Sequence, residues 1–144
     1  MSRALAPRFR APAGGLLSEK DLDLYVKVRR AAKGRSDADA ARAVGANPDE
    51  FAWVRARVVE ALVALDARRV ARAAAETYAR SLASLRQART SVRDPETARA
   101  MDEEIAALER ERAGLRREES LPQPVASNAR LVGARRAEIE SVSK

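Results

Sequence analysis

The sequence predicts an all-α protein: a small helical bundle with a long antiparallel two-helix coiled-coil hairpin. Alanine and arginine, which rank high among helix-forming residues, supply 56 of the 144 residues. Charged residues make up 34% of the chain beside an alanine-rich hydrophobic fraction of 46%, a balance that suits amphipathic helices. Neither Gly nor Pro occurs from residue 51 to residue 93, so one uninterrupted helix can run through this stretch.

The N-terminal residues 1–17 are expected to form a disordered basic tail, because they hold two Pro, two Gly and no acidic residue. A single helical domain is expected over residues 18–144. Its first helix is predicted at about 18–34, where Ser18 and Asp21 have the spacing of a capping box and a glycine ends the pattern.

Two more helices are predicted from their start and stop signals. A short one at about 36–45 lies between a serine cap and a glycine stop. A long one at about 48–93 begins at Asn47 and Pro48, since Asn is a good cap and Pro fits the first helical position. Glu50 completes a capping-box pattern at the same place.

The apolar stripe of the long helix occurs in two registers. One runs from Phe51 to Leu65 and the other from Ala71 to Val92, and neither continues well through residues 66–69. We therefore expect a change of packing partner, or a stutter in the supercoil, at that point.

The chain is expected to reverse at Asp94 and Pro95, which predict a new helix at about 95–119. Residues 51–93 carry nine Arg against three acids, whereas residues 94–119 carry five Arg against nine acids. An antiparallel pairing places these opposite charges together, which disfavours like-charged alternatives. The residues expected within reach of one another are Arg80, Arg86 and Arg89 on one arm and Asp102, Glu103, Glu104 and Glu109 on the other.

The C-terminal helix is predicted at about 127–143. Pro122 and Pro124 predict a linker before it, because proline disfavours a helix interior. Ser127 or Asn128 is the expected cap.

The chain contains no His and no Cys, and this excludes several kinds of chemistry. Ser-His-Asp and Cys-His nucleophiles, the usual zinc ligands and disulfides all need residues that it lacks. We predict no catalytic residue, no cofactor, no metal and no small-molecule substrate, and interpret the acidic run at 102–104 as a solvated helix face. No apolar run approaches the length of a membrane span, so a cytoplasmic location is expected. The excess of Arg over Lys is typical of GC-rich bacterial genomes.

The leading functional prediction is a non-enzymatic protein–protein interaction module: an adaptor, scaffold or assembly subunit. A protein partner or self-association is expected, because the long helix offers an extended Ala/Leu/Val surface. Phe51, Trp53 and Tyr78 are the aromatic residues of that helix and are the candidate partner contacts.

The alternative is a basic, helical, nucleic-acid-associated protein, suggested by a net charge of +7. Residues 38–54 resemble a helix-turn-helix corner, although Asp49 and Glu50 at the start of the second helix would repel phosphates. A plain helix–helix corner is therefore the preferred interpretation. The candidate phosphate contacts are Arg29, Arg30, Arg68, Arg69, Arg135 and Arg136.

Overall fold

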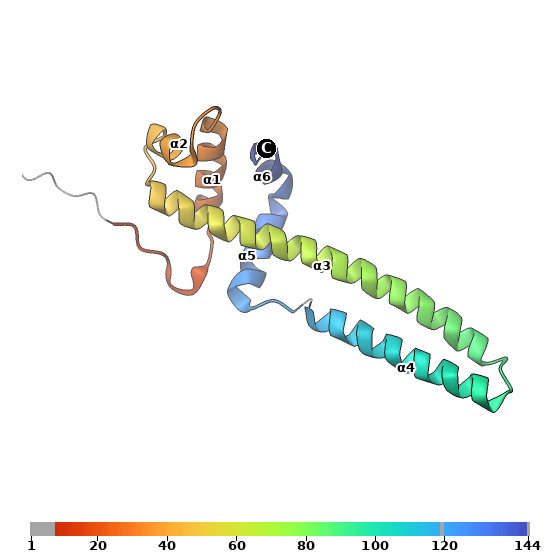
Figure 1. Cartoon of the computed structure of the whole chain (residues 1–144). Helices are drawn as coiled ribbons and strands as arrows, with labels where there is room; N and C mark the ends of the chain where they lie inside the picture. The colour runs from red at the N-terminus through yellow and green to blue at the C-terminus, as the bar shows by residue number, and fades with distance from the viewer. Residues whose placement is uncertain (1–7, 119, 144) are drawn as a thin grey trace, which may run out of the picture. The chain divides into compact units, whose positions relative to one another are not determined.

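A computed structural model describes residues 8–118 and 120–143, and within them the protein is all-α (Figure 1). Six α-helices and one short 3₁₀ helix, η1, occur in this part of the chain, and none of its residues forms a strand. The predicted fold class is confirmed. The chain divides into two compact units, where the sequence predicts one domain over 18–144: a core unit, Met1–Leu65 with Pro122–Lys144, and a hairpin unit, Asp66–Leu121.

The described part of the core unit contains five short helices and the first part of the longest helix. They are η1 (Ala13–Gly15), α1 (Glu19–Ala31), α2 (Asp37–Ala43), the first part of α3 (Pro48–Arg89), α5 (Gln123–Ala134) and α6 (Arg136–Val142). The boundary between the units, before Asp66, lies where the apolar register of the long helix changes in the sequence.

The predicted capping groups hold the starts of the first helices. The Ser18 side chain accepts a hydrogen bond from the Asp21 backbone N–H at 3.2 Å, and the Asp21 carboxylate accepts one from the Ser18 N–H at 2.9 Å. This is the reciprocal capping box that the spacing predicts. At the start of α3, Asn47 Oδ1 accepts from the Asp49 N–H at 2.8 Å.

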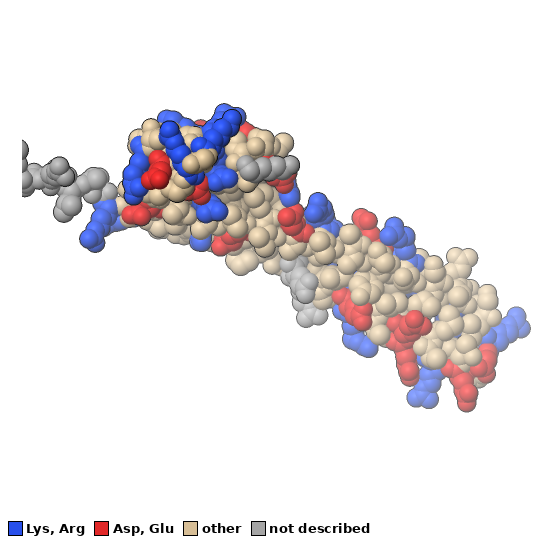
Figure 2. All heavy atoms as spheres, turned by 45° about the horizontal axis from the view of Figure 1, so that its top comes forward, with Lys and Arg blue, Asp and Glu red and all other residues tan. Residues whose placement is uncertain are grey.

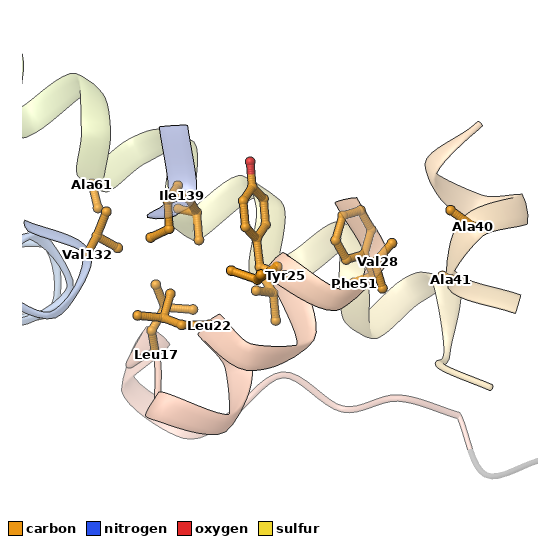
Figure 3. Packing of buried hydrophobic residues seen from close by; sticks show 13 residues of the cluster. Leu17, Leu22, Tyr25, Val28, Ala40, Ala41, Phe51, Ala61, Val132 and Ile139 are labelled. Atoms are coloured by element: carbon orange, nitrogen blue, oxygen red, sulfur yellow. The ribbon is translucent and has the colours of Figure 1, made fainter. Parts of the chain in front are cut away.

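The core of this unit is built around one face of α3 (Figure 3). The Phe51 ring is 1% exposed and stacks on the Tyr25 ring of α1, with centroids 6.0 Å apart and planes 19° apart. Further buried side chains come from every α-helix of the unit: Leu22 and Val28 of α1, Ala40 and Ala41 of α2, Val54, Val58 and Ala61 of α3, Val132 of α5 and Ile139 of α6.

The C-terminal segment departs from the prediction in three ways. The single helix predicted at 127–143 is two helices, α5 and α6, which meet at Arg135, where the backbone leaves the helical conformation with a φ of −116° and a ψ of 20°. α5 begins at Gln123, four residues before the predicted start, because Pro124 lies in the first helical turn, where its missing N–H costs nothing. Asn128 is not a cap but a buried residue, 2% exposed. Its side chain accepts a hydrogen bond from the Leu17 N–H at 2.8 Å and donates one to the Gly15 carbonyl at 2.9 Å.

The segment before α1 therefore makes specific contacts, in contrast to the expected disordered tail over 1–17. Leu17 is buried against the core, and the Phe9 ring lies 6.1 Å from the Trp53 ring, measured between centroids. Residues 1–7 of the expected tail lie outside the described residues.

The hairpin unit pairs the second part of α3 with α4 (Pro95–Glu118). The Asp94 carboxylate caps α4 by accepting from the Thr97 backbone N–H at 3.0 Å and the Thr97 hydroxyl at 2.6 Å. Arg89 pairs with Asp102 at 3.0 Å. Arg86 pairs with Glu109 as predicted, whereas Arg80 donates to the Thr77 hydroxyl.

Candidate interaction surfaces

Two of the predicted phosphate-contact arginines form ion pairs that connect different segments of the core unit. Arg29 pairs with Asp37 at 2.7 Å and its Nε donates to the Val142 carbonyl at 3.2 Å, so it connects α1 to α2 and α6. Arg135 pairs with Asp23 at 2.8 Å, and also with Glu138 and Glu19. Burial disfavours the charged form of Arg135, but the hydrogen bonds to Asp23 and Glu138 outweigh it and raise its pKa.

The other four predicted arginines differ in their surroundings. Arg136 pairs with Glu140 at 2.7 Å and Arg69 pairs with Asp66 at 3.6 Å. Arg68 also has a partner. Arg30 is exposed and has no ion pair within the described part of the chain. The six arginines therefore do not form one open cationic surface.

Arg30 belongs instead to a group of exposed cations at the end of α1. Figure 2 shows Lys and Arg side chains gathered over the α1 and α2 part of the core unit. The group consists of exposed residues for which no ion pair occurs among the described residues, namely Lys27, Arg30, Lys33 and Arg35. Cations near a helix C-terminus are stabilised by the helix dipole, which is one reason for their position.

The three aromatic residues proposed as partner contacts occupy different environments. Phe51 is buried in the core, so its side chain is not available to a partner in the folded unit. Trp53 is half-buried beside Phe9. Tyr78, in the hairpin unit, is half-buried, and a hydrogen bond to the Glu111 carboxylate raises its pKa.

The α2–α3 corner, within the predicted range 38–54, has the hydrogen bonding of a tight helix–helix turn. The Ala46 N–H donates to the Ala41 carbonyl at 2.8 Å. Gly45 has a φ of 77°, a left-handed conformation that a glycine adopts without strain. Asp49, in the first turn of α3, is exposed. A corner of this kind positions the two helices, and its acidic start offers nothing that attracts phosphate.

A second surface, which the sequence reasoning missed, lies on the outside of α3 in the core unit. Val59 is 46% exposed and Val63 is 63% exposed. Val63 is nine residues from the fully buried Val54, which places the two side chains on opposite faces of the helix. Ala52 and Ala56 are also exposed, and the order Ala52, Ala56, Val59, Val63 has steps of four, three and four residues, which keeps all four on one helix face. In the sequence, the sign of this surface is that Val59 and Val63 occupy positions outside the apolar stripe that the core buries. In the hairpin unit, the α3 residue Val70 is 65% exposed.

A cleft of about 630 Å³ lies between the segment before α1, α1 itself and the α2–α3 corner. It is lined by Arg8, Phe9, Lys20, Asp21, Leu24, Lys27, Val44, Gly45, Ala46, Asn47 and Glu50. Its volume falls within the usual range of ligand pockets.

The described residues contain neither a metal-binding cluster nor a membrane-spanning helix. Residues 8–118 and 120–143 contain no group of three or more carboxylate side chains placed to hold a metal ion. None of the helices found in the same residues combines the length and the apolar character that crossing a bilayer requires.

Comparisons of the chain with family models, curated proteins and solved structures found no match.

Proposed function

We propose that this chain is a non-enzymatic helical interaction module, an adaptor, scaffold or assembly subunit, whose α3 helix packs against a second copy. The observation that carries the proposal is the exposure of Val59 and Val63 on the face of α3 opposite its buried residues. A β-branched aliphatic side chain gains free energy when water is removed from it, and two on successive turns form a continuous strip.

The order of small and large side chains on this face of α3 indicates that its partner is a second copy of the same helix. In an antiparallel pair of identical helices, a two-fold axis between residues 57 and 58 places Ala56 opposite Val59 and Ala52 opposite Val63. Each contact then matches a small side chain with a larger one, so the two surfaces interdigitate. The strip is therefore complementary to itself.

The size of the strip sets the expected affinity. The eleven residue steps from Ala52 to Val63 span about 17 Å of helix. A helix pair of this length buries less than the ~1,000 Å² of a stable interface, so the expected dimer is weak and reversible.

The test is the oligomeric state of the purified full chain. Sedimentation velocity from about 10 µM to about 1 mM covers the range in which weak contacts dissociate. The wild-type mass should rise toward a dimer with concentration, and the double variant Val59→Asp, Val63→Asp should stay monomeric, because burying two carboxylates opposes the contact.

A matched control carries the same two acids on exposed positions of α3 away from the strip, Ala83→Asp with Ala88→Asp. This control should associate like the wild type. The proposal is wrong if the wild type remains monomeric throughout the range, or if both double variants lose association equally.

The competing function is association with nucleic acid, and the exposed cations Lys27, Arg30, Lys33 and Arg35 favour it. Such cations attract any phosphate backbone at low salt. Weak binding of duplex DNA that disappears at moderate salt is the outcome expected of an interaction module. Sequence-selective binding at physiological salt would instead favour the nucleic-acid function.

A further inference from the structure

The cleft of the core unit has three cationic side chains on its walls, Arg8, Lys20 and Lys27. All three are exposed, and none is ion-paired within the part of the chain that the structure describes. Of the two carboxylates in the lining, Asp21 is engaged by the Ser18 N–H in the capping box. Glu50 is the other, in the first turn of α3. Three cations against two carboxylates leave the lining of the cleft with a net positive charge.

The same cleft has an apolar floor. Leu24, Val44 and Ala46 line it, and each is half-buried because its other side packs against the hydrophobic core. The Phe9 ring lines a further part of the wall. An apolar side chain of a ligand would be removed from water here without opening the core.

The spacing of Lys20 and Lys27 determines how far apart two negative charges on a ligand should be. Lys20 and Lys27 are seven residues apart on α1, so their backbones are separated by about 10.5 Å along the helix axis, with Leu24 between them. In an extended peptide, side chains four residues apart lie on one face at a separation of ~13 Å, with a third side chain midway. Two flexible lysines can adjust to this small difference.

From these contacts we infer that the cleft binds an extended segment of a partner protein with the pattern acidic–x–apolar–x–acidic. The two carboxylates pair with Lys20 and Lys27, and the apolar side chain lies against Leu24, Val44 and Ala46. The inference adds a second surface and a partner chemistry to the proposed interaction module, and it does not use the valine strip.

Charge and apolar contact together distinguish an acidic peptide from two other candidate ligands, the chain's own N-terminal segment and nucleic acid. Residues 1–17 contain no acid, so the chain's own N-terminal segment does not fit the cationic walls. A nucleic-acid backbone offers phosphates for the cationic walls but no aliphatic group for the floor. An acidic peptide with a central leucine satisfies both the walls and the floor.

The probe is a synthetic peptide with Glu-Gly-Leu-Gly-Glu at its centre, added to the full chain at low salt. Trp53 is the chain's only tryptophan, and its ring neighbours Phe9 of the cleft, so its fluorescence reports occupancy without a label. Saturable binding is expected. Peptides with Gln in place of Glu, or Gly in place of Leu, should each bind about fivefold or more weakly.

The variant Lys20→Glu, Lys27→Glu should lower the affinity for the Glu peptide about tenfold or more, because two attractive pairs become repulsive. The matched control Lys33→Glu, Arg35→Glu reverses two exposed charges outside the cleft lining. It should change the affinity less than about twofold. All four positions are exposed, so circular dichroism should show an intact fold for both variants.

Three results would overturn the inference: no saturable change up to about 1 mM peptide, equal binding of the Glu and Gln peptides, or equal losses in the two double variants. Binding of duplex DNA that needs Lys20 and Lys27, without peptide binding, would assign the surface to nucleic acid. The Val59→Asp, Val63→Asp variant should bind the peptide normally, so failure of the dimer and failure of the cleft are distinguishable.

Discussion

The core unit and the hairpin unit are stabilised by different means. In the core unit, five helices contribute side chains to one hydrophobic cluster in which Phe51, Leu22 and Ile139 are almost completely buried. In the described part of the hairpin unit, Ala71 and Leu82 are the buried hydrophobic residues. The hairpin adds ion pairs between its arms, such as Arg89 with Asp102.

The difference follows from the number of helices that meet in each unit. Two paired helices bury one stripe of each, whereas several helices around a common centre bury side chains from all sides. Exposed ion pairs contribute only about 0.2–1 kcal/mol each, so they do not replace the missing hydrophobic burial. We expect the core unit to be the more stable of the two.

The largest effect is expected from Phe51→Ala in the core unit. The substitution removes a buried ring that stacks on Tyr25, at a cost of about 3–5 kcal/mol of unfolding free energy. Trp53 is the chain's only tryptophan and lies in the core unit, so its fluorescence reports the unfolding of that unit selectively. The measurement is the midpoint of guanidinium denaturation followed by this fluorescence, the Trp53 transition. An unchanged Trp53 transition would contradict the role assigned to this ring.

A smaller effect is expected from Leu82→Ala in the hairpin unit. Leu82 is 1% exposed, and its truncation should cost about 2–3 kcal/mol locally. Hydrogen exchange should accelerate at the amides of α4 while the Trp53 transition stays in place. Exposed Ala83 provides the control, because Ala83→Gly perturbs only helix propensity, by about 1 kcal/mol. If Leu82→Ala lowers the Trp53 transition equally, the units do not unfold separately.

The sequence predicts those features that local signals determine. The capping box at Ser18, the cap at Asp94 and the reversal before Pro95 each depend on residues within a few positions of one another. The opposite charges of the hairpin arms also predicted the pairs of Arg86 and Arg89.

Features that depend on distant residues were not predicted. The Asn128 side chain bonds to Leu17 across 111 positions, and Arg135 pairs with Asp23 across 112, so no local pattern marks either contact. The cleft also combines residues from separate segments. The candidate site was missed because the sequence does not show which arginines and valines the other helices cover.

Asn128→Ala is expected to have an intermediate effect on the core unit. Its loss leaves the buried Leu17 N–H and the Gly15 carbonyl without their partner, at a cost of about 1–3 kcal/mol. The Trp53 transition should move to lower denaturant, and exchange of the Leu17 amide should accelerate. Ser127→Ala, at the neighbouring half-buried position, should change the transition by less than about 0.5 kcal/mol. Equal shifts in the two variants would mean that Asn128 does not hold this segment.

The smallest effect concerns the exposed cap of the hairpin, Asp94. Hydrogen bonds from the Thr97 hydroxyl, and then from its backbone N–H, lower the pKa of Asp94 below its ordinary value of 3.8. Because the folded pKa is depressed, the cap stabilises α4 above the ordinary pKa and loses this effect as the pH falls through the folded pKa. Carboxyl NMR titration should show the lowered pKa, and Thr97→Val should raise it toward 3.8 by removing the hydroxyl donor. An unchanged pKa in that variant would assign the effect to the backbone alone. The side-chain cap of α3 is the Asn47 amide, which does not titrate, so acid below pH 3.8 should loosen the start of α4 more than the start of α3.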